Sequence, residues 1–434
     1  MFEVLKKARQ NARDHASVRS ARDACRTLMS ERGTANSVKF AAEVIEQYEA
    51  LSSAARAEFL AVLAEEFSPD PQRVLEQARR YAETRSAESL VELFNEVEPP
   101  RQELLRRINR APRGAATLLR IRTELLRELQ QHPELAAVEA DFRHLLSSWY
   151  DPGFLKLERV DWRTPAHLLE QIIQHEAVHA IRDWNDLRRR LQPDRRCFTF
   201  LHPILPEDLL IFVEVALVHA MPDAIAPLIG GSDVDLHPER ARCAVFYSIS
   251  NCQPGLRGVS LGNFLIKQVC ETLKSEYARL TRFCTLSPMP GFASWLRHGS
   301  PVDAKRLPKG AEVRVDQARN VLHEAFGDPR PGHELAALEA AEKPVRDALL
   351  RLAGAYLLIT RNHDATSDPV ANFHLGNGAR VERLNYLANR SARGLRESWG
   401  LMVNYVYDLA AIEHCHENFV EGKVETSREV LRLV

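Results

Sequence analysis

Hydrophobic side chains recur at three- and four-residue steps through most of the first 150 residues, most regularly over residues 37–67 and 115–132. That spacing places them on one face of a helix and predicts amphipathic helices. Ala, Leu, Arg and Glu dominate this part of the chain, and they favour helices intrinsically. Proline marks two helix starts, at Asp70-Pro71 and at Pro99-Pro100. Because no fixed-period repeat is evident, a helical bundle is favoured over a solenoid.

The pattern changes after the turn-rich segment 149–162. Beyond it, short runs rich in β-branched and aromatic residues alternate with helical segments, and these runs lie at 197–204, 209–218, 243–250 and 282–287. This alternation predicts a mixed α/β domain. The fold class we expect is therefore α+β, with a helical bundle domain over residues 1–155 and a mixed α/β domain over 156–434.

Two further helices are expected, one before and one after the run at 282–287. The one that follows Gly262 has an apolar stripe that should pack on the sheet, formed by Ile266, Val269, Leu273 and Tyr277. The segment ARVERLNYLAN at 379–389 also has the spacing of a helix.

Composition narrows the class of protein. The 434 residues favour two domains, and 58 Lys+Arg against 59 Asp+Glu give a net charge of −1, so nothing indicates nucleic acid or an anionic membrane as a partner. No run approaches the roughly 18 consecutive apolar residues of a membrane span, and the charged N-terminus does not resemble a secretory signal. Seven cysteines without a C-x-x-C pair argue against a disulfide framework. We expect a cytoplasmic protein.

The strand–turn–helix pattern over residues 244–273 is the first candidate for chemistry. Gly258 and Gly262 would let a ligand approach the backbone where a helix begins, and unpaired N–H groups with the helix dipole favour a diphosphate there. A plain connection between a strand and a helix remains the alternative. The turn is neither a Walker loop nor a G-x-G-x-x-G fingerprint.

Two later segments supply a serine and a histidine. Ser287 follows a strand and precedes Pro288-Met289-Pro290, which would stiffen the turn and hold the hydroxyl in place. His374 lies beside Asn372 in N-F-H-L-G-N-G, and histidine is the natural proton donor near neutral pH. The alternatives are a serine that bonds its own turn and a histidine with a structural role.

Three further motifs have structural alternatives. His175-Glu176-Ala177-Val178-His179 matches the zinc-protease pattern H-E-x-x-H, but no third ligand follows at a suitable spacing. Adjacent side chains in His414-Cys415-His416 would converge poorly on one metal ion. The arginines of 188–190 and 195–196 could contact the 3′-phosphate of coenzyme A, but a solvated helix face is the simpler explanation and the one we favour.

Several of these segments together resemble the malonyl-CoA decarboxylase family. They are WYDPGFLKLERVDW, HEAVHAIRDWNDLRRRL, FYSIS with QPGLRGVSLGNFLIKQV, TLSPMPGF, PVANFHLGNGA and GLMVNYVY, in the family's order from about residue 149 to the C-terminus. The resemblance implies a helical N-terminal domain that oligomerises and a C-terminal domain like the GNAT acetyltransferases. In that fold, coenzyme A lies in a V-shaped opening between central strands.

The resemblance also assigns roles to residues. Ser287 and His374 match the family's catalytic serine and histidine, Tyr407 matches an active-site tyrosine, and Asn372 is a further candidate for an orienting group. The coenzyme A loop would comprise Arg257, Gly258, Val259, Ser260, Leu261, Gly262 and Asn263. Position 260 is Ser here, where animal members have Glu, so any role of that carboxylate does not transfer.

The function implied is the conversion of malonyl-CoA to acetyl-CoA and CO2 by a carboxy-lyase of fatty acid metabolism. No metal or cofactor is expected, because the thioester itself accepts the electrons. A GNAT-type transferase that moves an acyl group to an amine is the main alternative, and a non-catalytic acyl-CoA sensor is a second. A homo-oligomer, either a dimer or a tetramer, is expected from the helical domain.

Overall fold

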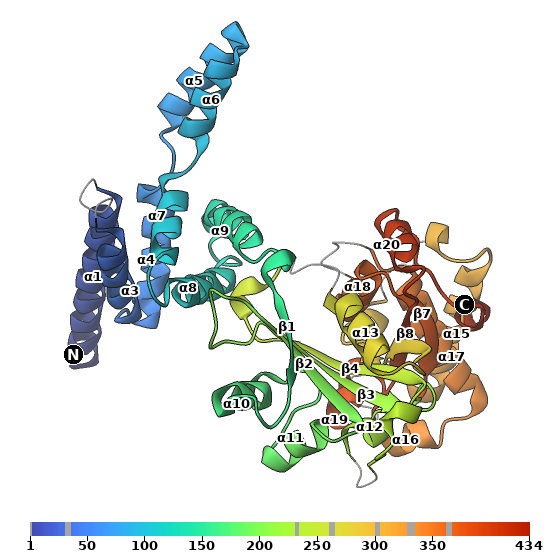
Figure 1. The fold of residues 1–434 in the computed structure, drawn as a ribbon. Helices are drawn as coiled ribbons and strands as arrows, with labels where there is room; N and C mark the ends of the chain where they lie inside the picture. The colour runs from blue at the N-terminus through green and yellow to red at the C-terminus, as the bar shows by residue number, and fades with distance from the viewer. Residues whose placement is uncertain are drawn as a thin grey trace. The chain divides into compact units, whose positions relative to one another are not determined.

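The computed structural model describes residues 2–30, 36–230, 234–259, 265–299, 304–327, 335–361 and 367–434. The chain divides into two compact units (Figure 1). Unit 1 comprises Met1–Leu155, His202–Pro206 and Gln253–Leu261, and unit 2 comprises Lys156–Leu201, Glu207–Cys252 and Gly262–Val434.

Unit 1 is helical. Its helices are α1 (Phe2–Met29), α3 (Ser37–Glu49), α4 (Ser53–Glu66), α5 (Pro71–Thr84), α6 (Ala87–Val97), α7 (Pro100–Asn109), α8 (Gly114–Glu128) and α9 (Ala136–Trp149). The helices predicted from hydrophobic spacing are confirmed. The helix expected after Asp70 begins at Pro71, and the Asp70 carboxylate caps it by accepting the N–H of Gln72 at 2.9 Å.

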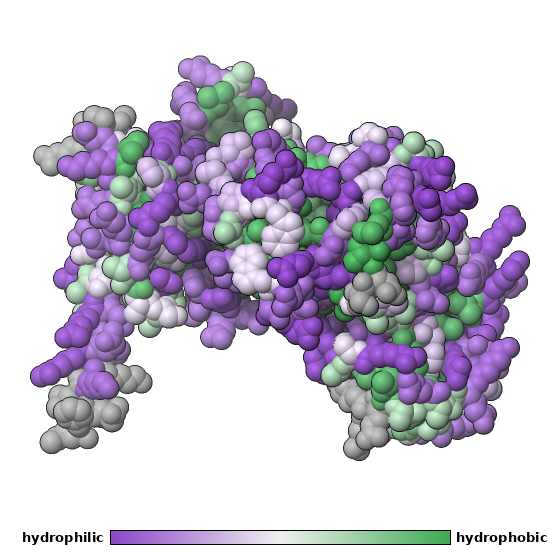
Figure 2. Space-filling model, turned by 60° about the horizontal axis from the view of Figure 1, so that its bottom comes forward, coloured by the Kyte–Doolittle hydropathy of each residue, from purple (hydrophilic) through white to green (hydrophobic). Residues whose placement is uncertain are grey.

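The helices of unit 1 bury their apolar faces against one another, with one exception. Buried side chains from five helices include Leu28, Tyr48, Leu63, Leu104 and Leu118. The hairpin of α5 and α6 instead exposes large apolar residues, of which Phe94 is 75% exposed and Val91 59% exposed. Figure 2 shows a surface that is mostly hydrophilic, with hydrophobic residues gathered in a few patches.

Unit 2 is built on a mixed sheet, which has eight strands in the part of the chain that the structure describes. The strands are β1 (Lys156–Val160), β2 (Arg195–Leu201), β3 (Ile211–Val218), β4 (Cys243–Asn251), β5 (Arg282–Thr285), β6 (Ser287–Pro288), β7 (Arg380–Asn385) and β8 (Met402–Tyr407). Strands β1 to β4 are antiparallel neighbours, β5 is parallel to β4, and β8 pairs antiparallel with β5, β6 and β7. The expected fold class, a helical region followed by a mixed α/β domain, is confirmed.

The helices of unit 2 connect and cover these strands. They are α10 (Ala166–His175), α11 (Trp184–Arg190), α12 (Ala226–Ile229), α13 (Leu265–Glu276), α14 (Phe292–His298), α15 (Ala311–Phe326), α16 (Leu335–Glu339), α17 (Lys343–Leu358), α18 (Pro369–Gly376), α19 (Ala392–Ser398), α20 (Ile412–Val420) and α21 (Arg428–Leu433). The stripe predicted on α13 is buried at Ile266, Val269 and Leu273, and Tyr277 just beyond it is also buried. No helix within the described ranges has the length and apolar character needed to cross a bilayer.

The parallel strands β4 and β5 separate partway along their length. They pair only from Cys243 to Phe246, and the N–H of Leu286 donates to the Phe246 carbonyl at 3.2 Å. Beyond that point β4 runs on to Asn251, whereas the segment after β5 continues as β6 and pairs with β8. An opening between two central strands is the feature that the acetyltransferase-like fold led us to expect.

The segment 379–389 is not a helix, so this prediction was wrong. Residues 380–385 form β7, which pairs with β8 from Arg380↔Val406 to Asn385↔Met402. Val381 and Leu384 are spaced as on a helix, but both are buried in the sheet because pairing with β8 outweighs the local pattern. The helix lies before this segment: α18 ends at Gly376, and Gly378 turns the chain with a φ of +78°.

Candidate active site

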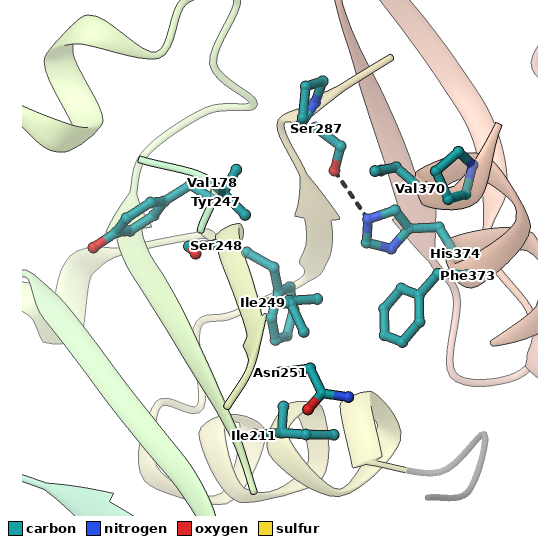
Figure 3. A pocket seen from close by; sticks show the side chains of 13 residues that line it. Val178, Ile211, Tyr247, Ser248, Ile249, Asn251, Ser287, Val370, Phe373 and His374 are labelled. Carbon is teal, nitrogen blue, oxygen red and sulfur yellow. Dashed lines mark hydrogen bonds between the residues drawn. The ribbon is translucent and has the colours of Figure 1, made fainter. Parts of the chain in front are cut away.

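A mostly apolar pocket of about 280 Å³ lies in unit 2 where β4 separates from its parallel neighbour (Figure 3). Strand β4 contributes Phe246, Tyr247, Ser248, Ile249 and Asn251 to the wall. The opposite wall is formed by Ser287 and Pro288 of β6 and by Pro369, Val370, Phe373 and His374 of α18, with Val178 and Ile211 completing the lining. None of these residues is a Lys, Arg, Asp or Glu, and burial determines the protonation of His374.

Ser287 is held by Thr285, the last residue of the preceding strand β5. Its hydroxyl donates to the Thr285 hydroxyl at 2.9 Å, and Thr285 also accepts the backbone N–H of Tyr405 at 3.2 Å. Thr285 and Ser287 are both buried. Thr285 therefore fixes the Ser287 side chain to β8, which limits its rotamer freedom.

His374 contacts Ser287 directly, although 87 residues separate them in the chain. The distance from His374 Nε2 to Ser287 Oγ is 3.0 Å, and Figure 3 shows the contact across the pocket wall. On the other side of the ring, Nδ1 lies 2.7 Å from the Tyr407 hydroxyl. Ser287, His374 and Tyr407, which sequence comparison proposed as a group, thus lie side by side.

Burial determines the protonation of this group. It lowers the pKa of His374 to about 3 and raises the pKa of the Tyr407 hydroxyl well above its usual value, so both are neutral at pH 7. A buried protonated phenol needs an acceptor, and Nδ1 is its partner here. The proton of the neutral imidazole therefore lies on Nε2, which donates to Ser287 Oγ. This arrangement lets Ser287 donate its own proton to Thr285.

The other residues proposed from sequence are placed differently. Asn372 lies on α18 beside the catalytic candidates, but its side chain is not among those that line the pocket. Of the proposed coenzyme A loop, Arg257, Gly258 and Val259 are described, and Gly258 has the positive φ of +75° that favours glycine. Ser260, Leu261, Gly262 and Asn263 lie outside the described residues.

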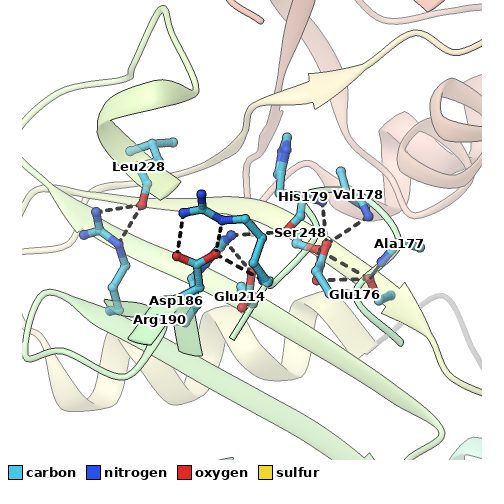
Figure 4. A network of polar contacts seen from close by, with 12 residues as sticks. Glu176, Ala177, Val178, His179, Asp186, Arg190, Glu214, Leu228 and Ser248 are labelled. Atoms are coloured by element: carbon cyan, nitrogen blue, oxygen red, sulfur yellow. Dashed lines mark hydrogen bonds and ion pairs between the residues drawn. The ribbon is translucent and has the colours of Figure 1, made fainter. Parts of the chain in front are cut away.

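The H-E-x-x-H segment does not have the geometry of a zinc site. Helix α10 ends at His175 and Glu176 is extended, so the two histidines do not share a helix face. Glu176 accepts the Ser248 hydroxyl at 2.7 Å and the N–H groups of Val178 and His179 at 2.8 and 2.7 Å (Figure 4). The described residues contain no group of three His, Cys, Asp or Glu side chains suited to a metal ion.

The arginine cluster is not a solvated helix face, in contrast to the simplest expectation. Arg190 is buried and pairs with the buried Glu214 at 2.9 Å, which Figure 4 shows beside Glu176. Arg195 and Arg196 are buried too and pair with Asp194 and Glu276 at 2.8 and 3.1 Å. These side chains are engaged within the domain, while Arg188 remains exposed.

Sequence reasoning missed two residues that hold the site together. Thr285 ends β5 two positions before Ser287 begins β6, and a two-residue step in extended chain places both side chains on one face. Asp368 precedes Pro369, as Asp70 precedes Pro71, and this helix-start signal would have placed His374 on a helix.

The chain thus combines a helical region with a mixed sheet domain in which a buried serine contacts a buried histidine. A family model described as "Malonyl-CoA decarboxylase C-terminal domain" matches residues 153–434, and one described as "Malonyl-CoA decarboxylase N-terminal domain" matches residues 67–150. The chain therefore belongs to the malonyl-CoA decarboxylase family, a family of carboxy-lyases, which confirms the resemblance drawn from its motifs.

Individual relatives agree with this assignment. The chain is 35% identical over 417 residues to "Malonyl-CoA decarboxylase, mitochondrial" of Rattus norvegicus, covering 91% of this chain and 85% of the relative. It is 43% identical to a solved malonyl-CoA decarboxylase from Rhodopseudomonas palustris, with a TM-score of 0.85 over 96% of this chain and 99% of the other. For a third, from Cupriavidus metallidurans, the identity is 35% and the TM-score 0.73, over 96% and 100% of the two chains.

Proposed function

We propose that this chain converts malonyl-CoA to acetyl-CoA and CO2 in the pocket between β4 and α18. The observation that supports this most strongly is the contact of Ser287, His374 and Tyr407 in an apolar pocket, at positions that match the family's catalytic motifs. No cofactor is required, because the thioester carbonyl accepts the electrons that the departing CO2 leaves behind.

The pocket's lack of charge favours loss of CO2. A malonyl carboxylate is stabilised by water or by a cation, whereas CO2 is neutral and needs neither. No Lys or Arg side chain is among the described residues that line the pocket. Transfer of the carboxylate into this environment therefore raises the energy of the substrate more than that of the transition state, in which the charge has moved toward the thioester.

His374 would supply the proton. As the C–C bond breaks, its electron pair moves to the α-carbon and the thioester oxygen, and the Nε2–H proton passes to the α-carbon. The Tyr407 hydroxyl at Nδ1 stabilises the negative charge that the imidazole gains. The ring recovers a proton from solvent when the product leaves.

Ser287 would act by hydrogen bonding and not as a nucleophile. A nucleophilic serine requires a base to remove its proton, but here Nε2 carries a proton and donates to Ser287 Oγ. Rotation of the Ser287 hydroxyl away from Thr285 would direct it at the thioester oxygen or the carboxylate. Removing such a donor costs about 10²–10³ in kcat in comparable enzymes.

The loop 257–263 would hold the phosphates of coenzyme A. Within unit 1, Arg122 donates to the Arg257 carbonyl at 2.8 Å. In a trans peptide the following N–H points away from that carbonyl, so the Gly258 N–H is directed away from Arg122. The N–H of an exposed glycine that faces away from Arg122, shortly before helix α13 in the chain, is suited to an anionic group.

Incubation with malonyl-CoA and no acyl acceptor tests the proposal. A decarboxylase releases CO2 and acetyl-CoA in equal amounts under these conditions. Acyl transfer that occurs only after an amine is added would identify a transferase instead, and binding without turnover would identify a sensor. Either result would overturn the proposed function.

We further propose that residues 1–155 form an oligomerisation domain and residues 156–434 the catalytic domain of a cytoplasmic dimer or tetramer in fatty acid metabolism. The exposed apolar hairpin of α5 and α6 supports self-association. The named relative from Rattus norvegicus is mitochondrial, so localisation of this chain in its own cell is the relevant test.

A further inference from the structure

Asp368 lies at the centre of the contacts that join the two sides of the active site, although it does not line the pocket. It is 1% exposed and precedes α18, the helix that carries His374. Oδ1 accepts the N–H groups of Val370 and Ala371, each at 3.0 Å. Oδ2 accepts the Gly291 N–H at 3.1 Å and the Tyr356 hydroxyl at 2.9 Å.

These four hydrogen bonds connect elements that are distant in sequence. Oδ1 caps the helix of His374, whereas Oδ2 holds Gly291, which ends the proline-containing turn that follows Ser287. Tyr356 comes from a third element, α17. One carboxylate therefore fixes the turn after Ser287 to the helix that presents His374.

The packing at Gly291 strengthens this connection. A Cβ at position 291 would lie 2.3 Å from the Tyr356 hydroxyl oxygen, closer than two such atoms can approach. The hydroxyl thus occupies the space that a side chain would take, and it donates to Asp368 from there. The turn cannot shift toward α17 without losing one of these contacts.

We propose that Asp368 is a positioning residue for the reaction, because it sets the distance between the Ser287 hydroxyl and the His374 ring. The inference rests on the proposed roles of those two residues. Asp368 does not line the pocket, and it acts by joining the two elements that carry Ser287 and His374. The site offers Asp368 four donors and no acceptor, which only an ionised carboxylate satisfies completely.

Asp368→Asn separates this role from simple helix capping. Asparagine caps helices about as well as aspartate, so its oxygen can keep the Val370 and Ala371 bonds. Its NH2 group would then face the Gly291 N–H, and the connection between the turn and the helix would be lost. Tyr356→Phe removes a single donor and keeps the Gly291 bond.

The experiment is steady-state decarboxylation of malonyl-CoA by the full chain, at a temperature where circular dichroism shows each variant folded. We expect Asp368→Asn to lower kcat about 10- to 100-fold with KM changed less than about threefold, because misplacement by about 1 Å has effects of this size. Tyr356→Phe should lower kcat by less than about fivefold, which is the loss of one of several hydrogen bonds. Asp183→Asn, the same change at the cap of α11, serves as the matched control and should leave kcat unchanged.

A kcat for folded Asp368→Asn within about twofold of wild type, or a raised KM with unchanged kcat, would overturn the inference. If Asp368→Asn does not fold, Asp368→Ser decides by the same criterion, since serine also caps helices but is too short to reach Gly291. Failure of the proposed function looks different, because wild-type chain would then release no CO2. A wild type that is active and loses activity in Ser287→Ala, together with a fully active Asp368→Asn, would contradict this inference alone.

Discussion

At the scale of single residues, the site depends on a series of hydrogen bonds in which each side chain donates to the next. Tyr407 donates to His374, His374 to Ser287, and Ser287 to Thr285. Because burial keeps His374 and Tyr407 neutral, the donor and acceptor of each hydrogen bond are fixed before substrate enters. Tyr407 at one end and Thr285 at the other therefore control the orientation of the imidazole and of the serine hydroxyl between them.

Substitution of Thr285 tests this series of hydrogen bonds and leaves both catalytic candidates intact. Thr285→Val keeps the shape of the side chain but removes the acceptor for Ser287 and for the Tyr405 N–H. We expect kcat for decarboxylation to fall about tenfold, the equivalent of one hydrogen bond of about 1.4 kcal/mol. Thr285→Ser retains the hydroxyl and should keep most of the rate. Equal rates for the Val and Ser variants would contradict the role of Thr285.

The buried imidazole of His374 also makes stability depend on pH. Its pKa is about 3 in the folded chain and near 6.5 when unfolded, so between these values only the unfolded state binds the proton. The contribution of His374 to the free energy of unfolding is therefore fully present above about pH 6.5. It falls by up to about 1.4 kcal/mol per pH unit as the pH decreases toward 3.

Urea unfolding of wild type and His374→Asn at pH 6, 5 and 4 measures this contribution. The variant should lose stability less steeply than wild type, by up to about 1.4 kcal/mol per pH unit. His179, whose pKa burial also lowers to about 3, and Glu214, whose pKa burial raises to about 8, titrate in both proteins and cancel in the comparison. Identical slopes would mean that His374 is protonated in the folded state.

At the scale of elements, the hairpin of α5 and α6 stands out because its apolar face is not covered within unit 1. Leu75, Leu90, Val91, Phe94 and Val97 are all at least 41% exposed. We expect this face to be buried between copies of the chain. Phe94→Asp should weaken self-association about tenfold or more, as loss of a central aromatic anchor does.

Sedimentation equilibrium over a range of protein concentrations measures this effect. Arg79→Ala changes an exposed residue of the same hairpin and should leave the association unchanged. If Phe94→Asp had the same concentration-dependent mass as wild type, the apolar face would not be the interface.

Arg122 on α8 is a buried residue that holds the start of the proposed coenzyme A loop. It pairs with Glu139 at 2.7 Å and donates to the carbonyls of Gly255 and Arg257. Arg122→Ala leaves the buried Gly255 carbonyl and the partly buried Glu139 carboxylate without their donor, and we expect it to destabilise the chain by about 3–5 kcal/mol.

Arg127→Ala on the same helix is the matched control, because Arg127 is 67% exposed and pairs only at the surface with Glu124. It should cost less than about 1 kcal/mol. Urea midpoints of the two variants measure the difference, and equal midpoints would contradict a role for Arg122 in holding the segment.

The elements also show how far the sequence alone could lead. Asp70 and Pro71 are a local signal, so the start of α5 could be predicted, whereas the segment 379–389 has helical spacing but becomes β7 because β8 lies beside it. The contact between Ser287 and His374 spans 87 residues and follows from no local pattern. Resemblance to a family proposed that pair, but it indicated neither Thr285 nor Asp368, whose roles depend on contacts made in the folded chain.

For the whole molecule, we propose that one unit supplies a helical surface for association and that the other holds a neutral pocket for catalysis. In that pocket, Ser287 and His374 would act together on the malonyl group. Groups that act as a unit have effects on rate that do not multiply, whereas independent groups have effects that do.

A double-mutant cycle on kcat for decarboxylation of malonyl-CoA tests whether the two residues act together. We expect Ser287→Ala to lower kcat about 10²–10³-fold and His374→Ala to lower it at least as much. The double variant should then be no more than about threefold slower than His374→Ala alone. A double variant whose loss equals the product of the two single losses, or a His374→Ala variant with near-wild-type acetyl-CoA production, would contradict joint action of Ser287 and His374.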